Sequence, residues 1–298
     1  MNHAPRPRPG SQYPPPSHHY LPRADGARLA LYTDGPDDAA VTAILAHGWC
    51  ATASIWHDHA RHLAARGIRV IRYDQRGHGA SPTGTSPAST QLLADDLAAV
   101  LRHTRRRSHV VVAGHSMGGM AALQLAAHHP AVAASLSGVL LVATSSGQMD
   151  LTAAQHPPLE RLVGMARHSI ATLCLRLPGP TQTVRDLLSP TSDPRPPIDV
   201  AADWYRAVTE HHIQPGSLAS LSAIPVHIMA GERDRLVPAV HALRLAAQLP
   251  HAQLHVVPDG RHGLPSEQPA QVRAVLEELC ELGRTRPIHR PRWHLRSA

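Results

Sequence analysis

Short apolar runs alternate with segments of helical periodicity along most of this chain. Apolar runs that are bounded by glycine, proline or polar residues are typical of strands within a sheet. Such runs predict strands at 28–32, 41–46, 68–72, 109–113, 137–143, 226–230 and 253–257. Apolar residues at helical spacing predict helices at 55–66, 90–103, 119–129, 240–248 and 268–282, with Ser89 or Thr90 as the N-cap of the second. Strands that alternate with helices indicate a mostly parallel sheet covered by helices on both faces.

The pattern changes between Ser145 and Pro215, where repeated prolines interrupt helical segments and no strand alternation is found. We interpret this stretch as a helical lid that is inserted into the α/β core. The first residues are rich in proline and the last in arginine, which is typical of disordered termini. The predicted organisation is a leader at 1–17, a core at 18–144 and 216–282, a lid at 145–215 and a basic tail at 283–298.

Charge adds one possible partner class to this picture. The 298 residues carry a formal net charge of +7 with histidine neutral, and all 29 basic residues are arginine. Part of this charge lies in the tail, which we interpret as a solvated terminus. The alternative is a tether for nucleic acid or an anionic membrane. Because Trp293 is the single aromatic residue of the tail, no nucleic-acid partner is expected.

Cysteine spacing and hydropathy suggest a cytoplasmic protein without a cofactor. The chain has no run of 18 apolar residues, so no transmembrane helix is predicted. The N-terminal residues lack the apolar segment of a secretory signal, and the three cysteines are far apart. His57, His59 and His62 could suggest a metal, but the first two would not share one face of a helix. Neither a metal nor a dinucleotide is therefore expected.

The candidate chemistry begins with the run Gly114-His115-Ser116-Met117-Gly118. This run lies between a predicted strand and a predicted helix. A serine on such a turn is pushed out of the sheet with its hydroxyl exposed, and the flanking glycines permit the tight backbone. We therefore predict that Ser116 is a nucleophile and that the neighbouring His115 is structural.

A serine hydroxyl needs a base to take its proton and an acid to orient that base. Asp234 follows one predicted strand and His262 follows the last one. The carboxyl ends of parallel strands lie at one edge of a sheet, so we expect both side chains beside Ser116. Other carboxylates in loops after strands are alternative acids: Glu232, Asp259 and Asp150.

Acyl chemistry also needs N–H donors for the negative oxygen of the tetrahedral intermediate. One is expected to be the backbone N–H of Met117, which follows the nucleophile. The other is expected to be that of Trp49, because Gly48 lets the loop after an earlier strand turn in closely. Three further residues are expected to line the substrate pocket: His47, Cys50 and Trp204.

Taken together, these motifs resemble the α/β-hydrolase superfamily. The matching segments lie within about residues 28–282 and are 47–49, 74–81, 114–119, 231–234 and 260–263. The resemblance implies an α/β-hydrolase fold, with a mostly parallel eight-stranded sheet, helices on both faces and an inserted helical lid. It is closest in kind to cofactor-free carboxylesterases, lipases, enol-lactonases and haloperoxidases. The serine excludes the dehalogenases and epoxide hydrolases of this fold, which use an aspartate nucleophile.

The favoured hypothesis is a serine hydrolase that cleaves a small carboxylic ester through an acyl-enzyme intermediate. The same triad could act on a lactone, a thioester or a C–C bond, or could catalyse perhydrolysis, because the triad does not select the bond. A non-catalytic ligand-binding protein of the same fold is the remaining alternative. The sequence leaves the substrate, the acyl length and the oligomeric state open.

Overall fold

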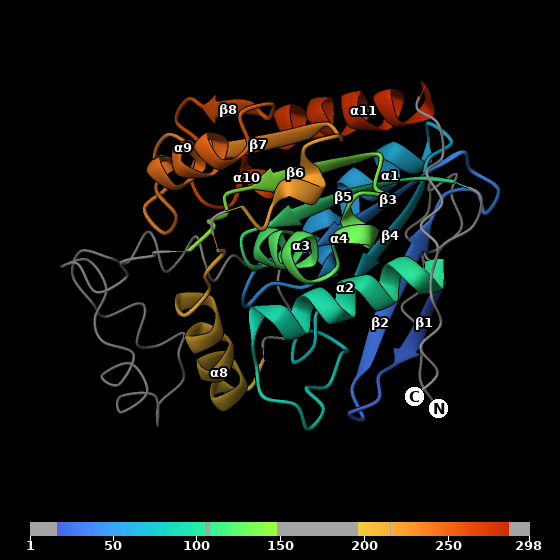
Figure 1. The fold of residues 1–298 in the computed structure, drawn as a ribbon. Coiled ribbons are helices and arrows are strands. Elements are labelled where there is room, and N and C mark those ends of the chain that lie inside the picture. The colour runs from blue at the N-terminus through green and yellow to red at the C-terminus, as the bar shows by residue number, and fades with distance from the viewer. Residues whose placement is uncertain (1–16, 105–107, 148–195, 215, 286–298) are drawn as a thin grey trace.

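An eight-stranded sheet organises the chain in the computed structural model, which describes residues 17–104, 108–147, 196–214 and 216–285 (Figure 1). The strand order is β1-β2-β4-β3-β5-β6-β7-β8. Strand β2 pairs antiparallel with β1 and β4, and all other neighbours are parallel. The strands are β1 Ser17–Pro22, β2 Arg28–Asp34, β3 Val41–Ala46, β4 Arg69–Tyr73, β5 His109–His115, β6 Gly138–Val142, β7 Val226–Gly231 and β8 Gln253–Val257.

Helices connect the parallel strands, as right-handed crossovers between such strands require. The α-helices are α1 His57–Ala64, α2 Thr90–Thr104, α3 Met117–His128, α4 Pro130–Ala133, α8 Ile198–Thr209, α9 Ala239–Gln248, α10 Leu264–Glu267 and α11 Pro269–Thr285. Two 3₁₀ turns are η1 Ala53–Trp56 and η2 Ala219–Leu221. Ser89 caps α2, because its hydroxyl accepts a hydrogen bond from the backbone N–H of Leu92.

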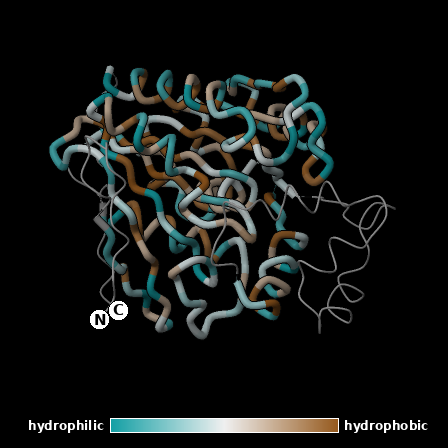
Figure 2. The backbone as a smooth tube through the Cα atoms, turned by 180° about the vertical axis from the view of Figure 1, so that it is seen from behind, coloured by the Kyte–Doolittle hydropathy of each residue, from teal (hydrophilic) through white to brown (hydrophobic). Residues whose placement is uncertain are grey.

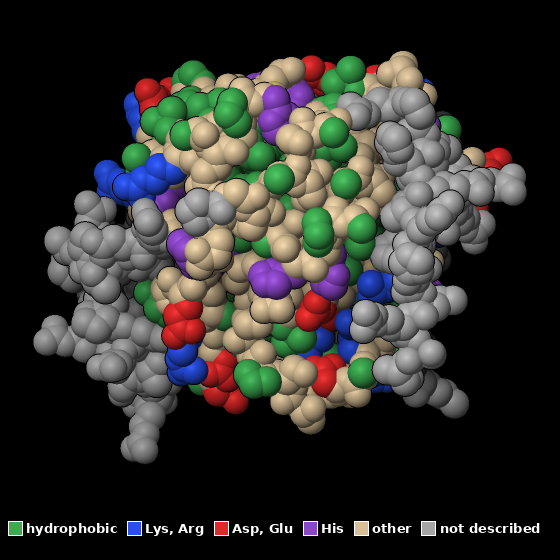
Figure 3. All heavy atoms as spheres, in the orientation of Figure 1, with side chains coloured by type: hydrophobic (Ala, Val, Ile, Leu, Met, Phe, Trp, Pro, Cys, Tyr) green, Lys and Arg blue, Asp and Glu red, His purple; other side chains and the backbone are tan. Residues whose placement is uncertain are grey.

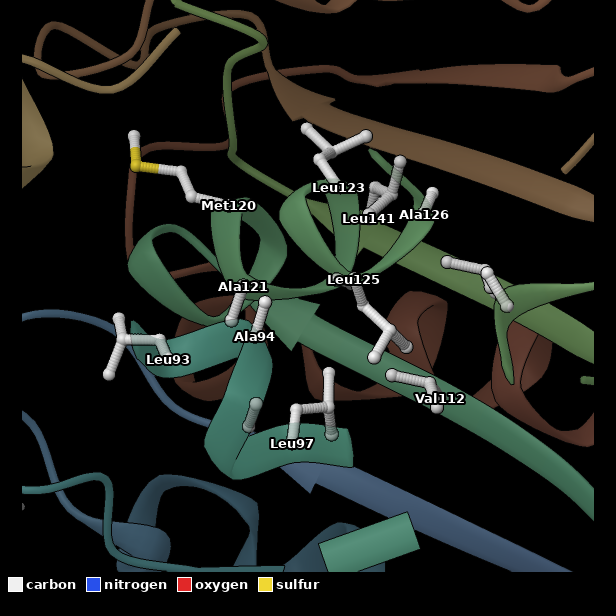
Figure 4. Packing of buried hydrophobic residues seen from close by; sticks show 14 of the residues in the cluster. Leu93, Ala94, Leu97, Val112, Met120, Ala121, Leu123, Leu125, Ala126 and Leu141 are labelled. Carbon is white, nitrogen blue, oxygen red and sulfur yellow. The ribbon is translucent and has the colours of Figure 1, made fainter. Parts of the chain in front are cut away.

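Two apolar cores cover the two faces of the sheet, which runs through the middle of the molecule (Figure 2). One core joins α2, α3 and α9 to the sheet, and its centre is the contact of α2 with α3. Figure 4 shows Leu93 and Leu97 of α2 near Ala121 and Leu125 of α3, with Val112 of β5 close to Leu125. The other core joins α1 and α11 to the opposite face. Strands β3 to β7 are consequently buried on both faces, which explains their continuous apolar runs.

The predicted strands and long helices are confirmed to within a few residues. The differences fall on short or mixed segments. Strand β1 was not predicted, and Ser17, assigned to the leader, begins it. The segment expected to be one helix from residue 55 begins as the 3₁₀ turn η1, where the Thr52 hydroxyl accepts a hydrogen bond from the N–H of Ser54. The four-residue helices α4 and α10 are too short to show a helical period.

The predicted division into leader, core, lid and tail stays a prediction. Residues 148–195 of the expected lid lie outside the described part of the chain, as do 1–16 and 286–298. The end of the expected lid that is described contains α8. Charged side chains gather over α8 in Figure 3, where Asp203 and Arg206 form an exposed ion pair. Within the described ranges, every helix is too short or too polar to cross a membrane.

Candidate active site

Ser116 stands on the turn between β5 and α3 with a backbone conformation that is rare for a residue with a side chain. Its φ is 51° and its ψ is −115°, and such strain persists only when the surrounding structure enforces it. Two hydrogen bonds hold the backbone of Ser116 in this conformation, one at its N–H group and one at its carbonyl group. The N–H of Ser116 donates to the carbonyl of Val142 at 2.8 Å, and its carbonyl accepts from the Thr144 hydroxyl at 2.8 Å.

The glycines around Ser116 are required by close packing of the backbone. A Cβ atom on Gly114 would lie 2.3 Å from the carbonyl oxygen of Gly118. A Cβ on Gly118 would lie 2.5 Å from the carbonyl oxygen of Ala46 at the end of β3. A side chain at either position would push the nucleophile turn away from the sheet, so the G-x-S-x-G spacing follows from the geometry of this turn.

The structure brings Ser116, His262 and Asp234 together in one hydrogen-bonded chain, although they come from three separate loops. The Nε2 atom of His262 lies 3.0 Å from the Ser116 hydroxyl, and its Nδ1 atom lies 2.8 Å from Oδ2 of Asp234. A carboxylate accepts hydrogen bonds, so Nδ1 carries the proton and Nε2 is left as the acceptor for the serine hydroxyl. This arrangement can remove a proton from Ser116.

The buried Asp234 carboxylate is stabilised by backbone donors of its own loop. Its Oδ1 atom accepts hydrogen bonds from the N–H groups of Leu236 at 2.8 Å and Val237 at 2.9 Å. Its side chain is completely shielded from solvent, whereas 9% of the His262 side chain is exposed. With the bond from His262, three donors satisfy a charge that would otherwise be costly to bury.

The alternative acids in the described part of the chain have other partners. Glu232 accepts a hydrogen bond from the backbone N–H of Asp259, and the Asp259 carboxylate forms an ion pair with Arg233. Both side chains of that ion pair are largely exposed. Asp150 lies outside the described residues. Among the described carboxylates, it is Asp234 that contacts His262.

The loop after β3 passes directly beside Ser116. A Cβ atom on Gly48 would lie 3.2 Å from Cβ of Ser116, so the absence of a side chain there permits this approach. Within the described ranges, the N–H groups of Trp49 and Met117 have no hydrogen-bond partner. Two unpaired N–H groups beside a serine can donate hydrogen bonds to an oxyanion and so stabilise its charge. The next residue, Cys50, is buried with a φ of 55°, which places the loop in a strained turn.

The Trp49 side chain connects this loop to α8. Its indole N–H donates to the carbonyl of Ala201 at 2.9 Å, and its ring packs against Tyr205 at a centroid distance of 5.4 Å. Trp204 of α8 is buried and packs against His78, close to Gly77. The two tryptophans therefore fix α8 against two of the loops at the carboxyl edge of the sheet.

His47 is fully buried, and backbone groups occupy both of its ring nitrogens. Nδ1 donates to the carbonyl of Gly48 at 2.7 Å, and Nε2 accepts from the N–H of Gln75 at 2.8 Å. Burial lowers its pKa to about 4, so the ring is neutral at neutral pH. Its nitrogens are engaged in linking two loops. The prediction that His47, Cys50 and Trp204 line a substrate pocket stays a prediction.

Asp74 is a positioning residue that sequence reasoning did not single out, although it opens the segment 74–81. Its carboxylate accepts hydrogen bonds from the N–H groups of Ala53 at 2.7 Å and Ala80 at 2.9 Å, and from the Tyr32 hydroxyl at 3.0 Å. Because Ala53 follows the loop that carries Trp49, Asp74 holds that loop beside the site. The available signal was the aspartate that opens the segment 74–81, one of the segments that resemble the superfamily.

Two of the three histidines that could have suggested a metal have separate contacts. His59 bonds through Nε2 to the carbonyl of Pro265 at 2.7 Å, and His62 contacts Glu277 of α11. Burial lowers the pKa of His57. The described residues contain no group of three or more metal-ligating side chains.

Comparison with known proteins agrees with the fold. Residues 37–269 match the hydrolase family that is described as serine aminopeptidase, S33. The chain belongs to this α/β-hydrolase family. Among solved structures of the fold, a thermophilic esterase from Thermogutta terrifontis is similar with a TM-score of 0.69 at 23% identity. The similarity covers 90% of this chain and all of the esterase chain, and it concerns the fold.

Two relatives of this chain are named for haloperoxidase, esterase or perhydrolase activity. A non-heme haloperoxidase of Rhodococcus erythropolis is 30% identical over 261 residues, which cover 79% of this chain and 90% of the relative. The bifunctional esterase/perhydrolase DCH of Acinetobacter calcoaceticus is 27% identical over 273 residues, which cover 84% and 94%.

Proposed function

We propose that this α/β hydrolase is a serine carboxylesterase that acts on a small-molecule ester. The observation that carries the proposal is the buried chain of contacts from Ser116 through His262 to Asp234. A relative named esterase/perhydrolase supports the ester as the substrate class.

The proposed reaction begins when the Ser116 hydroxyl attacks the ester carbonyl while Nε2 of His262 takes its proton. Asp234 holds His262 in the tautomer that can accept this proton and stabilises the imidazolium that forms. The N–H groups of Trp49 and Met117 bind the negative oxygen of the tetrahedral intermediate. His262 then gives its proton to the departing alcohol, which leaves an acyl group on Ser116.

Water completes the cycle when His262 takes a proton from it and the resulting hydroxide attacks the acyl carbonyl. The bond between the acyl group and Ser116 then breaks, His262 returns the proton to the serine oxygen, and the carboxylic acid is released. Hydrogen peroxide in place of water would give a peracid and the free serine by the same steps. Perhydrolysis is our second candidate, because one relative described above is named a haloperoxidase and the other a perhydrolase. A lactone, thioester or C–C substrate would use the same groups, and the described residues do not favour one of these bonds.

The test is hydrolysis of p-nitrophenyl esters of increasing acyl length by the wild type, Ser116→Ala and the control Ser217→Ala. Ser217 is a partly exposed serine outside the site, and its hydroxyl donates to the carbonyl of Gln214. Loss of at least about 10⁴-fold in kcat by Ser116→Ala alone would support the proposal. An aminoacyl p-nitroanilide as substrate distinguishes peptidase from esterase activity. Oxidation of bromide in a mixture with acetate and hydrogen peroxide reports the formation of a peracid. Ester hydrolysis that survives in Ser116→Ala, or a folded wild type inactive on every ester, would contradict it.

A further inference from the structure

His115, the last residue of β5, contacts the main chain of the proposed base. Its Nε2 atom lies 2.8 Å from the backbone carbonyl oxygen of His262, which is 147 residues later in the sequence. A carbonyl oxygen can only accept, so Nε2 of His115 carries the proton and donates it. The two imidazole rings lie 5.0 Å apart between centroids. His115 therefore joins the nucleophile turn, through its covalent bond to Ser116, to the loop that carries the base.

The other nitrogen of the His115 ring gains no hydrogen bond from its position. Nδ1 is buried and has no partner in the described part of the chain, and it faces Gly48, where a Cβ atom would lie 2.8 Å away. A buried polar atom without a partner destabilises a fold. The unpartnered Nδ1 atom therefore gives no reason, in terms of fold stability, for a histidine at this position. The hydrogen bond that Nε2 donates to the His262 carbonyl does give a reason.

His115 also keeps the same charge throughout the proposed cycle. Burial, together with the nearby His262, lowers its pKa to about 3. A proton that arrives on His262 from Ser116 therefore remains there, and His115 continues to donate to the His262 carbonyl. The geometry of this contact is independent of the protonation state of the base.

Two other side chains that accept hydrogen bonds from the main chain of the base loop lie at the surface. The N–H of Asp259 donates to Glu232, and the N–H of Arg261 donates to Glu267, both in exposed positions. Water competes with such bonds, so they restrain the loop weakly. The bond from His115 is buried and is therefore better able to fix the main chain of His262.

We propose that His115 is a positioning residue, whose Nε2–H bond to the His262 carbonyl sets the distance between the base and Ser116. Asp234 orients the ring of His262 from its Nδ1 side, and His115 holds the backbone from which that ring extends. This inference rests on the proposed function, because it assigns a role within the same triad. It differs from a purely structural role in predicting a loss of turnover without a matching loss of stability.

The test compares two amide side chains that differ in reach. In His115→Gln the amide nitrogen is the same number of bonds from Cβ as Nε2 of histidine, whereas in His115→Asn it is one bond closer and falls short of the carbonyl. We expect kcat on a p-nitrophenyl ester to fall about 10- to 100-fold in the Asn variant, as misplacement of a catalytic group by about 1 Å does. KM should stay within about twofold of the wild type, and the Gln variant should recover kcat to within about threefold.

His109→Asn is the matched control, because His109 lies at the opposite end of β5 and its ring is 3.4 Å from the Ser137 hydroxyl. Its kcat should equal that of the wild type. His115→Leu, which lacks a donor, replaces the Asn variant if that variant does not fold. The proposal is overturned if the Asn or Leu variant keeps the wild-type kcat. It is also overturned if the loss in kcat tracks the loss in Tm and is not recovered by glutamine.

A second readout separates failure of this inference from failure of the proposed function. A fluorophosphonate forms a covalent bond with an activated serine and releases fluoride, so its rate of reaction reports how well His262 activates Ser116. A wild type that cleaves no ester would contradict the proposed esterase. The order of labelling rates would still decide the role of His115: similar rates for wild type and Gln with a slower Asn support it, and equal rates for all three overturn it.

Discussion

Replacement of Asp234 by asparagine tests the proposed acid, because the structure determines how the new amide would lie. Oδ1 of Asp234 accepts from the N–H groups of Leu236 and Val237 at 2.8 and 2.9 Å. These two donors would hold the amide oxygen of asparagine in the same place. The amide NH₂ group would therefore face Nδ1 of His262, where Oδ2 lies 2.8 Å away in the native chain.

An NH₂ donor at this position inverts the tautomer of His262. Nδ1 becomes the acceptor, and the proton moves to Nε2, which lies 3.0 Å from the Ser116 hydroxyl. The ring can then no longer accept the serine proton. We expect kcat to fall about 10⁴-fold, which is the loss typical of a triad with the wrong tautomer and corresponds to about 5.5 kcal/mol of activation free energy at about 1.4 kcal/mol for each factor of ten.

The assay is steady-state hydrolysis of the best p-nitrophenyl ester, with thermal unfolding measured in parallel. The bonds from Leu236 and Val237 and the contact with His262 are all retained in the variant, so Tm should change by only a few degrees. Glu232→Gln and Asp259→Asn are matched controls, because both acids lie in the same two loops and bond elsewhere. An Asp234→Asn variant with kcat within tenfold of the wild type would refute this reasoning, and a large loss in either control would redirect the assignment.

Two further predictions concern stability. Arg76 and Asp96 form a buried bidentate ion pair at 2.6 and 2.7 Å. Arg76→Ala should therefore lower the free energy of unfolding, measured in urea, by about 3–5 kcal/mol, because it removes the bidentate partner of the buried Asp96 carboxylate. Arg206→Ala, which removes an exposed ion pair, should lower it by less than about 1 kcal/mol, and equal losses in the two variants would contradict this prediction. Burial lowers the pKa of His211 from 6.5 to about 4. Its contribution to stability is therefore complete above pH 6.5 and is lost as the pH falls toward 4. His211→Gln should remove up to about 3 kcal/mol of pH dependence in this window, and an unchanged slope would show that His211 titrates normally.

The sequence alone was sufficient to predict the alternation of strands and helices, the location of Ser116 on a strand-to-helix turn, and the loops that carry Asp234 and His262. These features are local. A buried parallel strand is read from a continuous apolar run, and a nucleophile turn is read from glycines within four residues of one another. Strand β1 escaped prediction because its polar and histidine-rich residues carry no apolar run.

The tertiary structure decided which side chains meet. The sequence left three carboxylates in competition with Asp234, and the fold selected among those that are described by bringing Asp234 to Nδ1 of His262. It also gave His115 a partner that lies 147 residues away, and it turned the nitrogens of His47 toward backbone groups. Such pairings depend on how the strands are ordered in the sheet and on distances of a few tenths of an ångström. Local periodicity contains neither, so contacts between distant loops became visible only when the chain was folded.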